Sequence, residues 1–223
     1  MDSSTFLSII IPAFNEESRL RETLPGLKRF LDRQDYAWEV ILVDDGSEDD
    51  TSGVLQEFFT PEQGRGVRYT PNRGKGYAIR QGVAAARGEV LLFTDADFST
   101  PITEFPRLVQ FLSQGFDIAI GSRSLPESNV VEHQAWYREG MGKVFNLMVR
   151  LLLFRGIIDT QCGFKCLRRE QALPLFEKLT LDGFSYDVEL LYLAKKRGLK
   201  IAEVPVTWKN HPESKVVIFR DVY

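Results

Sequence analysis

Val90-Leu91-Leu92-Phe93-Thr94-Asp95-Ala96-Asp97 is an apolar run closed by two acids, and it predicts a buried strand with two carboxylates at its C-terminal end. In open α/β sheets, ligands bind at that end of the strands. Two carboxylates this close repel each other unless a cation lies between them, and such oxygen ligands suit Mg²⁺ or Mn²⁺ bound together with a substrate diphosphate. The alternative is that both acids cap the next helix, because Thr100-Pro101 is typical of an N-cap and a first-turn proline.

Strand-like runs recur on both sides of this stretch, and helical patterns lie between them. Their starting points are roughly 23 to 34 residues apart, which is the length of a strand plus a crossover helix. The runs cover residues 6–11, 40–43, 67–69, 90–93 and 116–120. Leucines on one face predict a helix over residues 20–31, which Pro25 is expected to kink. A capping box at Ser47-Glu48-Asp49-Asp50 opens a second helix through Phe59, and a third covers residues 78–86. This alternation predicts an α/β fold with a mostly parallel central sheet and helices on both faces.

The second half of the chain is less regular. We expect a polar loop over residues 124–132 and a helix over residues 136–154. A turn leading into a short strand follows at residues 159–167, then a helix over 187–196, a strand over 200–206 and a polar loop over 211–215.

Composition excludes several classes of protein. The chain has 223 residues, of which 43% are hydrophobic and 26% charged, so it can form a substantial core. A net charge of −3 argues against a nucleic-acid partner, which would require a basic excess. Cys162 and Cys166 make a poor zinc set with His133 and His211, so we expect buried, inert thiols in a reducing compartment.

We expect neither a signal peptide nor a membrane span. Residues 1–5 are short and polar, and residues 6–11 belong to a strand. The longest apolar run, residues 144–158, is interrupted by Asn146, Arg150 and Arg155, and it falls short of the roughly 18 to 20 apolar residues that a span needs. We interpret it as a core helix, with a helix on a lipid surface or a subunit contact as the alternative.

Three further turns carry candidate ligand-binding groups. In Pro12-Ala13-Phe14-Asn15-Glu16, an aromatic face beside an acid suits a base and its ribose, although a simple β-to-α turn would look the same. In Asp44-Asp45-Gly46-Ser47, a carboxylate either accepts hydrogen bonds from a nucleoside or caps a helix. Asn72-Arg73-Gly74-Lys75-Gly76 precedes a helix, where glycines suit a phosphate, but it is neither a Walker nor a Rossmann motif. The coincidence of these turns with Asp95-Ala96-Asp97 at one sheet edge is more specific than any of them alone.

These motifs, with Ser8-Ile9-Ile10-Ile11 before them and Gly121-Ser122-Arg123 after them, resemble those of the inverting family 2 glycosyltransferases in the same order. The resemblance implies the GT-A nucleotide-diphospho-sugar transferase fold in one domain over residues 1–223. Its nucleotide-sugar-binding half would be residues 1–122 and its acceptor-binding half residues 123–223. Asp159-Thr160-Gln161-Cys162-Gly163-Phe164-Lys165, Tyr186-Asp187-Val188-Glu189-Leu190-Leu191 and Glu213-Ser214-Lys215 resemble more narrowly the dolichyl-phosphate glucosyltransferases, with the dolichyl-phosphate mannose synthases close behind.

The resemblance also implies ligands and site residues. The donor would be a nucleotide sugar, with UDP-glucose first and GDP-mannose as the alternative, and the acceptor a polyprenyl (dolichyl-type) phosphate. Asp95 and Asp97 would bind Mg²⁺ or Mn²⁺ and the diphosphate, while Ser99 stands where mannose synthases of this group often carry a glutamine. Arg123 would contact either the donor sugar-phosphate region or the acceptor phosphate, and Arg138 would contact the acceptor phosphate. The candidate donor-binding residues are Pro12, Phe14, Glu16, Val43, Asp45, Lys75, Asp95, Ala96, Lys209 and Lys215.

Two kinds of acceptor require different chemistry. A phosphate monoester, with a second pKa of about 6, is largely dianionic at neutral pH and needs cations rather than a base. Arg123 and Arg138 suit that need, because arginine binds phosphate at two points. A saccharide hydroxyl needs a general base, for which Asp187 is the candidate, although Asp187 is also interpreted as a helix N-cap. The candidate catalytic residues are therefore Asp97, Arg123 and Asp187.

A lipid acceptor would give the apolar residues 147–153 a role. With Lys143, Arg150 and Arg155 they would form a basic, apolar surface against an anionic leaflet. We therefore expect a cytoplasmic protein that is peripheral at the cytoplasmic face of a membrane. A nucleotide-binding module without transferase activity is disfavoured, because the charged residues that transfer would need are all present.

Overall fold

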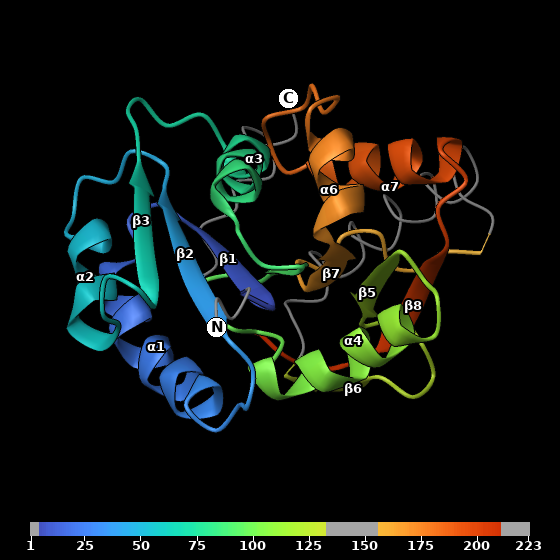
Figure 1. Cartoon of the computed structure of the whole chain (residues 1–223), viewed down its shortest axis with the longest axis horizontal. Coiled ribbons are helices and arrows are strands. Elements are labelled where there is room, and N and C mark those ends of the chain that lie inside the picture. Colours follow the sequence, from blue (N-terminus) through green and yellow to red (C-terminus); the bar gives the residue numbers. More distant parts are fainter. Residues whose placement is uncertain (1–4, 133–155, 211–223) are drawn as a thin grey trace.

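The computed structural model describes residues 5–132 and 156–210 of the chain (Figure 1). Seven strands form one sheet in the order β3-β2-β1-β4-β7-β5-β8, and β6 pairs with β9 in a second, smaller sheet. The strands are β1 (Leu7–Ala13), β2 (Trp38–Asp44), β3 (Gly64–Arg68), β4 (Val90–Phe93), β5 (Ile118–Ser122), β6 (Asn129–Glu132), β7 (Lys165–Arg168), β8 (Ile201–Pro205) and β9 (Thr207–Lys209).

The central sheet is parallel except at one strand. Strand β7 runs antiparallel to both of its neighbours, β4 and β5, whereas the other pairs in this sheet are parallel. The predicted α/β class with a mostly parallel sheet is therefore confirmed. The reversed strand inside the sheet was not predicted, because an apolar run has the same pattern in either direction.

Helices cover both faces of the sheet (Figure 1). Helices α1, α2 and α4 lie on one face and α3, α6 and α7 on the other. Strand β1 contributes to both cores, with Ile9 and Ile11 facing the first and Ile10 the second, all fully buried. The helices are α1 (Glu17–Leu31), α2 (Thr51–Phe58), α3 (Lys75–Ala85), α4 (Phe105–Ser113), α6 (Arg169–Phe176) and α7 (Tyr186–Lys196), with a short 3₁₀ helix η1 (Ile102–Glu104) before α4.

The predicted leucine face of α1 is confirmed, since its four leucines are buried. The helix runs through Pro25 as one element. The capping box was wrong, because α2 begins at Thr51. Ser47 and Asp49 instead accept hydrogen bonds from the N–H groups of Asn15 (2.9 Å) and Glu17 (3.1 Å), and so bind the turn between β1 and α1.

In the second half of the chain, some of the expected elements are confirmed and others differ. The loop expected over residues 124–132 ends in β6, whereas the late strand and the helix after residue 186 are confirmed as β8 and α7. Both cysteines are free and buried as predicted, and burial raises the pKa of each thiol. The elements expected over residues 136–154 and 211–215 lie outside the described residues. Within the part of the chain that the structure describes, none of the helices has the length and apolar character needed to cross a bilayer.

Candidate active site

The C-terminal ends of four strands bring the predicted site residues together. Phe14 follows β1, Asp45 follows β2, Asp95 follows β4 and Arg123 follows β5. These strands point the same way in one sheet, so their ends lie at one edge, which is where ligands bind in open α/β folds. The coincidence expected from the motifs is therefore realised in space.

Asp45 joins the end of β2 to the glycine-rich loop before α3. Its two carboxylate oxygens accept the main-chain N–H groups of Arg73 (2.7 Å) and Gly74 (2.8 Å). Gly74 has φ = +98°, a left-handed conformation that favours glycine. Burial raises the pKa of Asp45 against the opposing effect of these hydrogen bonds. The neighbouring Asp44 accepts the Ser47 N–H (2.8 Å). Asp44 therefore stabilises the turn after β2, whereas Asp45 binds the glycine-rich loop.

Lys75 and Asp95 form an ion pair at the centre of this edge. Lys75 is the first residue of α3, and its Nζ donates to Asp95 Oδ1. Burial acts to raise the pKa of Asp95, but the positive charges of Lys75, Lys165 and Arg123 outweigh it and hold that pKa below its usual value. The pKa of Lys75 is raised, because the effect of Asp95 exceeds that of burial. The site thus favours an ionised carboxylate beside a cation.

Asp97 holds the turn after β4. Its Oδ1 accepts the Ser99 N–H (2.8 Å), and the backbone adopts φ = +46° at Phe98, an uncommon conformation that clusters at functional sites. The Ser99 carbonyl in turn accepts the N–H of Lys209 (2.8 Å), which brings β9 beside the acidic turn. Helix capping is not the role of these acids, because η1 has Pro101 at its N-cap without a side-chain hydrogen bond.

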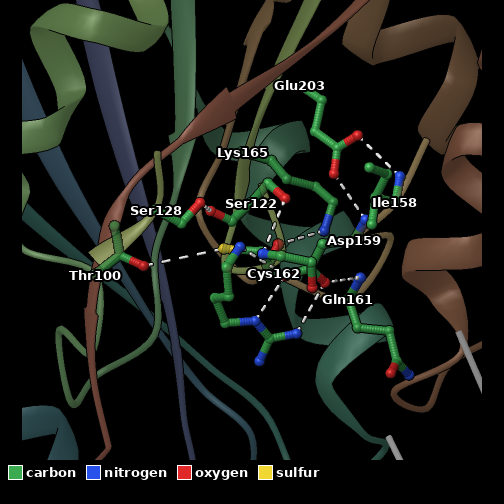
Figure 2. Close-up of polar contacts among 11 residues, drawn as sticks. Thr100, Ser122, Ser128, Ile158, Asp159, Gln161, Cys162, Lys165 and Glu203 are labelled. Atoms are coloured by element: carbon green, nitrogen blue, oxygen red, sulfur yellow. Dashed lines mark hydrogen bonds and ion pairs between the residues drawn. The ribbon is translucent and has the colours of Figure 1, made fainter. Parts of the chain in front are cut away.

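Arg123 is paired with a buried carboxylate. Its Nε donates to Asp159 Oδ2 (2.7 Å) and its Nη2 to Asp159 Oδ1 (2.9 Å), which leaves Nη1 outside the pair. Asp159 is fully buried, and Glu203 accepts the N–H groups of Ile158 (2.8 Å) and Asp159 (2.7 Å), as Figure 2 shows. Burial opposes ionisation of Asp159, yet Arg123 outweighs it and lowers the carboxyl pKa. Two guanidinium nitrogens of Arg123, Nε and Nη2, are therefore hydrogen-bonded within the protein.

Asp187 has a partner that the sequence did not indicate. It lies in the first turn of α7, whose N-cap is Ser185, so the N-cap interpretation was wrong. Its Oδ1 instead accepts a hydrogen bond from Lys165 Nζ (2.6 Å), and both side chains are buried.

The other candidate donor-binding residues differ in how much of each is accessible to a nucleotide. Phe14 is 39% exposed beside the end of β1, and Pro12 is partly exposed. Glu16 pairs with Arg19 (2.6 Å), and the Ala96 carbonyl accepts the Thr23 hydroxyl (3.0 Å). The side chain of Val43 is fully buried in the core, so only its main chain is available to a nucleoside.

Arg138 and Lys215 lie outside the described residues, so their roles stay predictions. Three charged residues near the site were not assigned a role from the sequence, namely Asp159, Lys165 and Glu203. The sequence offered a signal for Asp159 and Lys165, because both belong to a motif in the turn that leads into the expected short strand.

The two acids after β4 fit a hard divalent cation. Among residues 5–132 and 156–210 there is no cluster of three or more His, Cys, Asp or Glu side chains suited to a metal. Asp95 accepts a hydrogen bond from Lys75 with one oxygen, and Asp97 accepts the Ser99 N–H with one oxygen. Among the residues that the structure describes, the second oxygen of each is available to a cation. Mg²⁺ typically takes one or two carboxylates and completes its octahedron with substrate phosphates and water, so two acids suffice.

We expect Gly163→Ala to lower turnover about a hundredfold while the protein stays folded. A Cβ at residue 163 would lie within about 3 Å of all three carboxylate atoms of Asp95, so the acid must move away. A shift of about 1 Å at a catalytic group can cost a hundredfold in rate. Steady-state kinetics and thermal unfolding would measure both effects. Gly66→Ala is the matched control, because a Cβ there meets nothing within 4 Å, and equal losses in both variants would contradict this explanation.

The sequence was compared with known families and curated proteins. The Glycosyl transferase family 2 profile matches residues 8–173. Proteins named dolichyl-phosphate beta-glucosyltransferase are 37% identical in Mus musculus, 38% in Drosophila melanogaster and 36% in Homo sapiens. Each match covers 96% of this chain and 70% of the relative.

Solved structures give the same fold. Glucosyl-3-phosphoglycerate synthase from Mycobacterium tuberculosis in complex with UDP is 23% identical, with a TM-score of 0.70 over 95% of this chain and 74% of that chain. Its complex with Mn²⁺ and UDP-glucose is 20% identical, with a TM-score of 0.66 over 95% and 73% of the two chains. The family profile and the curated relatives therefore identify a nucleotide-sugar-dependent glycosyltransferase, and the solved structures show that its fold is of the GT-A type. The chain belongs to glycosyl transferase family 2.

Proposed function

We propose that this enzyme transfers glucose from UDP-glucose to a dolichyl-type polyprenyl phosphate with the help of Mg²⁺ or Mn²⁺. The observation that carries the proposal is the match to dolichyl-phosphate beta-glucosyltransferases, which at 37% identity spans 96% of this chain and so includes both halves of the sheet. The Mn²⁺ and UDP-glucose bound to the mycobacterial relative of the same fold support the choice of donor and metal.

The acids after β4 would prepare the leaving group. When bound to Asp95 and Asp97, a divalent cation supplies Lewis-acid stabilisation of the diphosphate. Lys75 adds a fixed positive charge beside the same carboxylates, and its place at the N-terminus of α3 adds the partial positive charge of a helix end. An acceptor oxygen forms the new bond at the anomeric carbon as the bond to the diphosphate breaks, and UDP leaves with the bonding electrons. Attack from the opposite face inverts the configuration.

The acceptor would be a phosphate rather than a sugar hydroxyl. A phosphate dianion needs no proton removed, and the free edge of Arg123 can offset its charge. The hydroxyl alternative needs Asp187 as a base, but this carboxylate is buried and already accepts a hydrogen bond from the Lys165 ammonium. A prenyl chain on the acceptor would in turn place the enzyme at a membrane surface, on its cytoplasmic face.

A panel of donors and acceptors tests this proposal. The full chain is incubated with Mg²⁺ or Mn²⁺, radiolabelled UDP-glucose, UDP-galactose or GDP-mannose, and a short polyprenyl phosphate. We expect label in the organic phase from UDP-glucose, and loss of that product with EDTA. Product from GDP-mannose alone would replace the proposed donor, and turnover only with free saccharides would overturn the phosphate acceptor.

A further inference from the structure

Lys165 is a fully buried lysine on an interior strand of the sheet, and it has no part in the chemistry proposed for the site. It is the first residue of β7, where it pairs with Phe93 of β4 on one side and Ile120 of β5 on the other. Its side chain is 0% exposed. A buried ammonium group is costly unless it is paired and hydrogen-bonded, so its two partners show what it holds together.

The ammonium group of Lys165 joins two separate segments. Its Nζ donates to Asp187 Oδ1 at the start of α7 (2.6 Å) and to the Cys162 carbonyl in the turn before β7 (2.5 Å). Figure 2 shows the Lys165 side chain reaching toward this turn, with Asp159 and Glu203 nearby. Lys165 therefore fixes the turn relative to both the sheet and α7.

That turn supports reactive groups on two sides. Gly163, directly after Cys162, lies so close to Asp95 that even one added carbon atom would collide with the carboxylate. Asp159, in the same turn, holds the guanidinium of Arg123 through two hydrogen bonds. A displacement of the turn would therefore move both the predicted metal ligand and the predicted acceptor-binding arginine.

We propose that Lys165 is a positioning residue for transfer, acting through the Cys162 carbonyl and Asp187 to hold Asp95 and Arg123 in their reactive places. In this arrangement Asp187 is the counter-ion of Lys165 rather than a base. The inference concerns the geometry of both the predicted metal ligand and the predicted acceptor-binding arginine. Its kinetic test rests on the proposed function, because that function supplies the substrates.

The test removes the charge pair without leaving half of it buried. Lys165→Met alone would strand the Asp187 carboxylate, so the main variant is Lys165→Met with Asp187→Asn, a neutral pair of similar volume. We expect its kcat to fall about a hundredfold while the KM for UDP-glucose changes less than about threefold, because Phe14 and Asp45 are left untouched. The single variant Lys165→Arg keeps the positive charge, so its kcat should be at least a tenth of the wild-type kcat.

A matched control separates positioning from general loss of stability. Glu39 is also buried and ion-paired, with Arg65 (2.9 Å), but it lies in the first half of β2, toward the opposite edge of the sheet. Glu39→Gln should lower the unfolding temperature without lowering the kcat of the folded enzyme. A neutral double variant that turns over at the wild-type rate would overturn the proposal, as would an equal loss of kcat in Glu39→Gln.

A crystal structure of the double variant gives a readout that needs no substrate. We expect the turn around Gly163 and the Asp95 carboxylate to move by about 1 Å or more from their wild-type positions. Unmoved groups would overturn the positioning role. Absence of product from every donor with the wild-type enzyme would instead count against the proposed function, and the structural comparison would still decide the role of Lys165.

Discussion

Asp97→Ala is expected to lower transfer of glucose about a thousandfold and to leave the protein folded. The substitution removes one of the two carboxylates that would bind the divalent cation, and Lewis-acid stabilisation of a leaving diphosphate is worth several kcal/mol, of which about 4 corresponds to a thousandfold. The fold should persist because Asp97 is only partly buried and its carboxylate accepts a hydrogen bond from one main-chain group within residues 5–132 and 156–210, the Ser99 N–H. Initial rates at saturating donor, together with thermal unfolding, measure the two effects.

Asp117→Ala is the matched control for that experiment. Asp117 also accepts a single main-chain N–H bond of 2.8 Å, from Lys200, but it precedes β5 and so lies at the opposite edge of the sheet. Losing the hydrogen bond costs both variants a similar amount of stability, and only Asp97→Ala should lose activity. If Asp97→Ala kept more than a tenth of the wild-type rate, the acids after β4 would not bind an essential metal.

Arg123→Met is expected to destabilise the fold by about 3 kcal/mol as well as to slow transfer. The substitution leaves the Asp159 carboxylate buried without its ionic partner, and breaking such a pair from one side costs roughly 3 to 5 kcal/mol. We take the lower end of that range because the Arg123 side chain is 28% exposed and partly screened by water. Chemical denaturation measures the loss, and the double variant with Asp159→Asn should recover most of it.

The same variant should respond to pH in a defined direction. Burial opposes ionisation of Asp159, but the charge of Arg123 outweighs burial and lowers the pKa of Asp159 below the pKa of the unfolded chain. The ion pair therefore stabilises the fold at pH values above the unfolded pKa. This contribution is lost as pH falls through the lowered folded-state pKa of Asp159, below the unfolded pKa of about 3.9. The difference in unfolding free energy between wild type and Arg123→Met should therefore stay constant near neutral pH, and shrink as pH falls below about 5 and on through the lowered pKa of Asp159. A difference that stays constant with pH over this acidic range would contradict the ion pair.

Much of the site could be predicted from the sequence because it lies at strand ends. Each motif combines a buried apolar run with the polar residues that follow it, and a parallel sheet brings such ends to one edge. Asp45, Lys75, Asp95 and Arg123 could therefore be grouped from the order of the motifs along the chain. The motifs in the second half of the chain narrowed the family resemblance to the dolichyl-phosphate glucosyltransferases.

Partners within the site could not be predicted, because they depend on contacts between distant parts of the chain. Asp187 was expected to be a base or an N-cap, yet it pairs with Lys165, which is 22 residues away in the sequence. Ser47 was expected to open a helix, but it binds the turn after β1 instead, and Asp49 hydrogen-bonds both that turn and the first residue of α2. A side chain that hydrogen-bonds a neighbouring turn has the same local pattern as one that caps its own helix.

Hydrophobic periodicity and turn chemistry are local properties, so the alternation of strands and helices, the two cores and the placement of acids and glycines at one edge follow from the order of the residues alone. The reversed direction of β7, the pairing of Arg123 with Asp159 and the burial of Lys165 against Asp187 emerge when the chain folds. These features depend on which distant segments meet in a water-excluded interior, where an unpaired charge is too costly to remain.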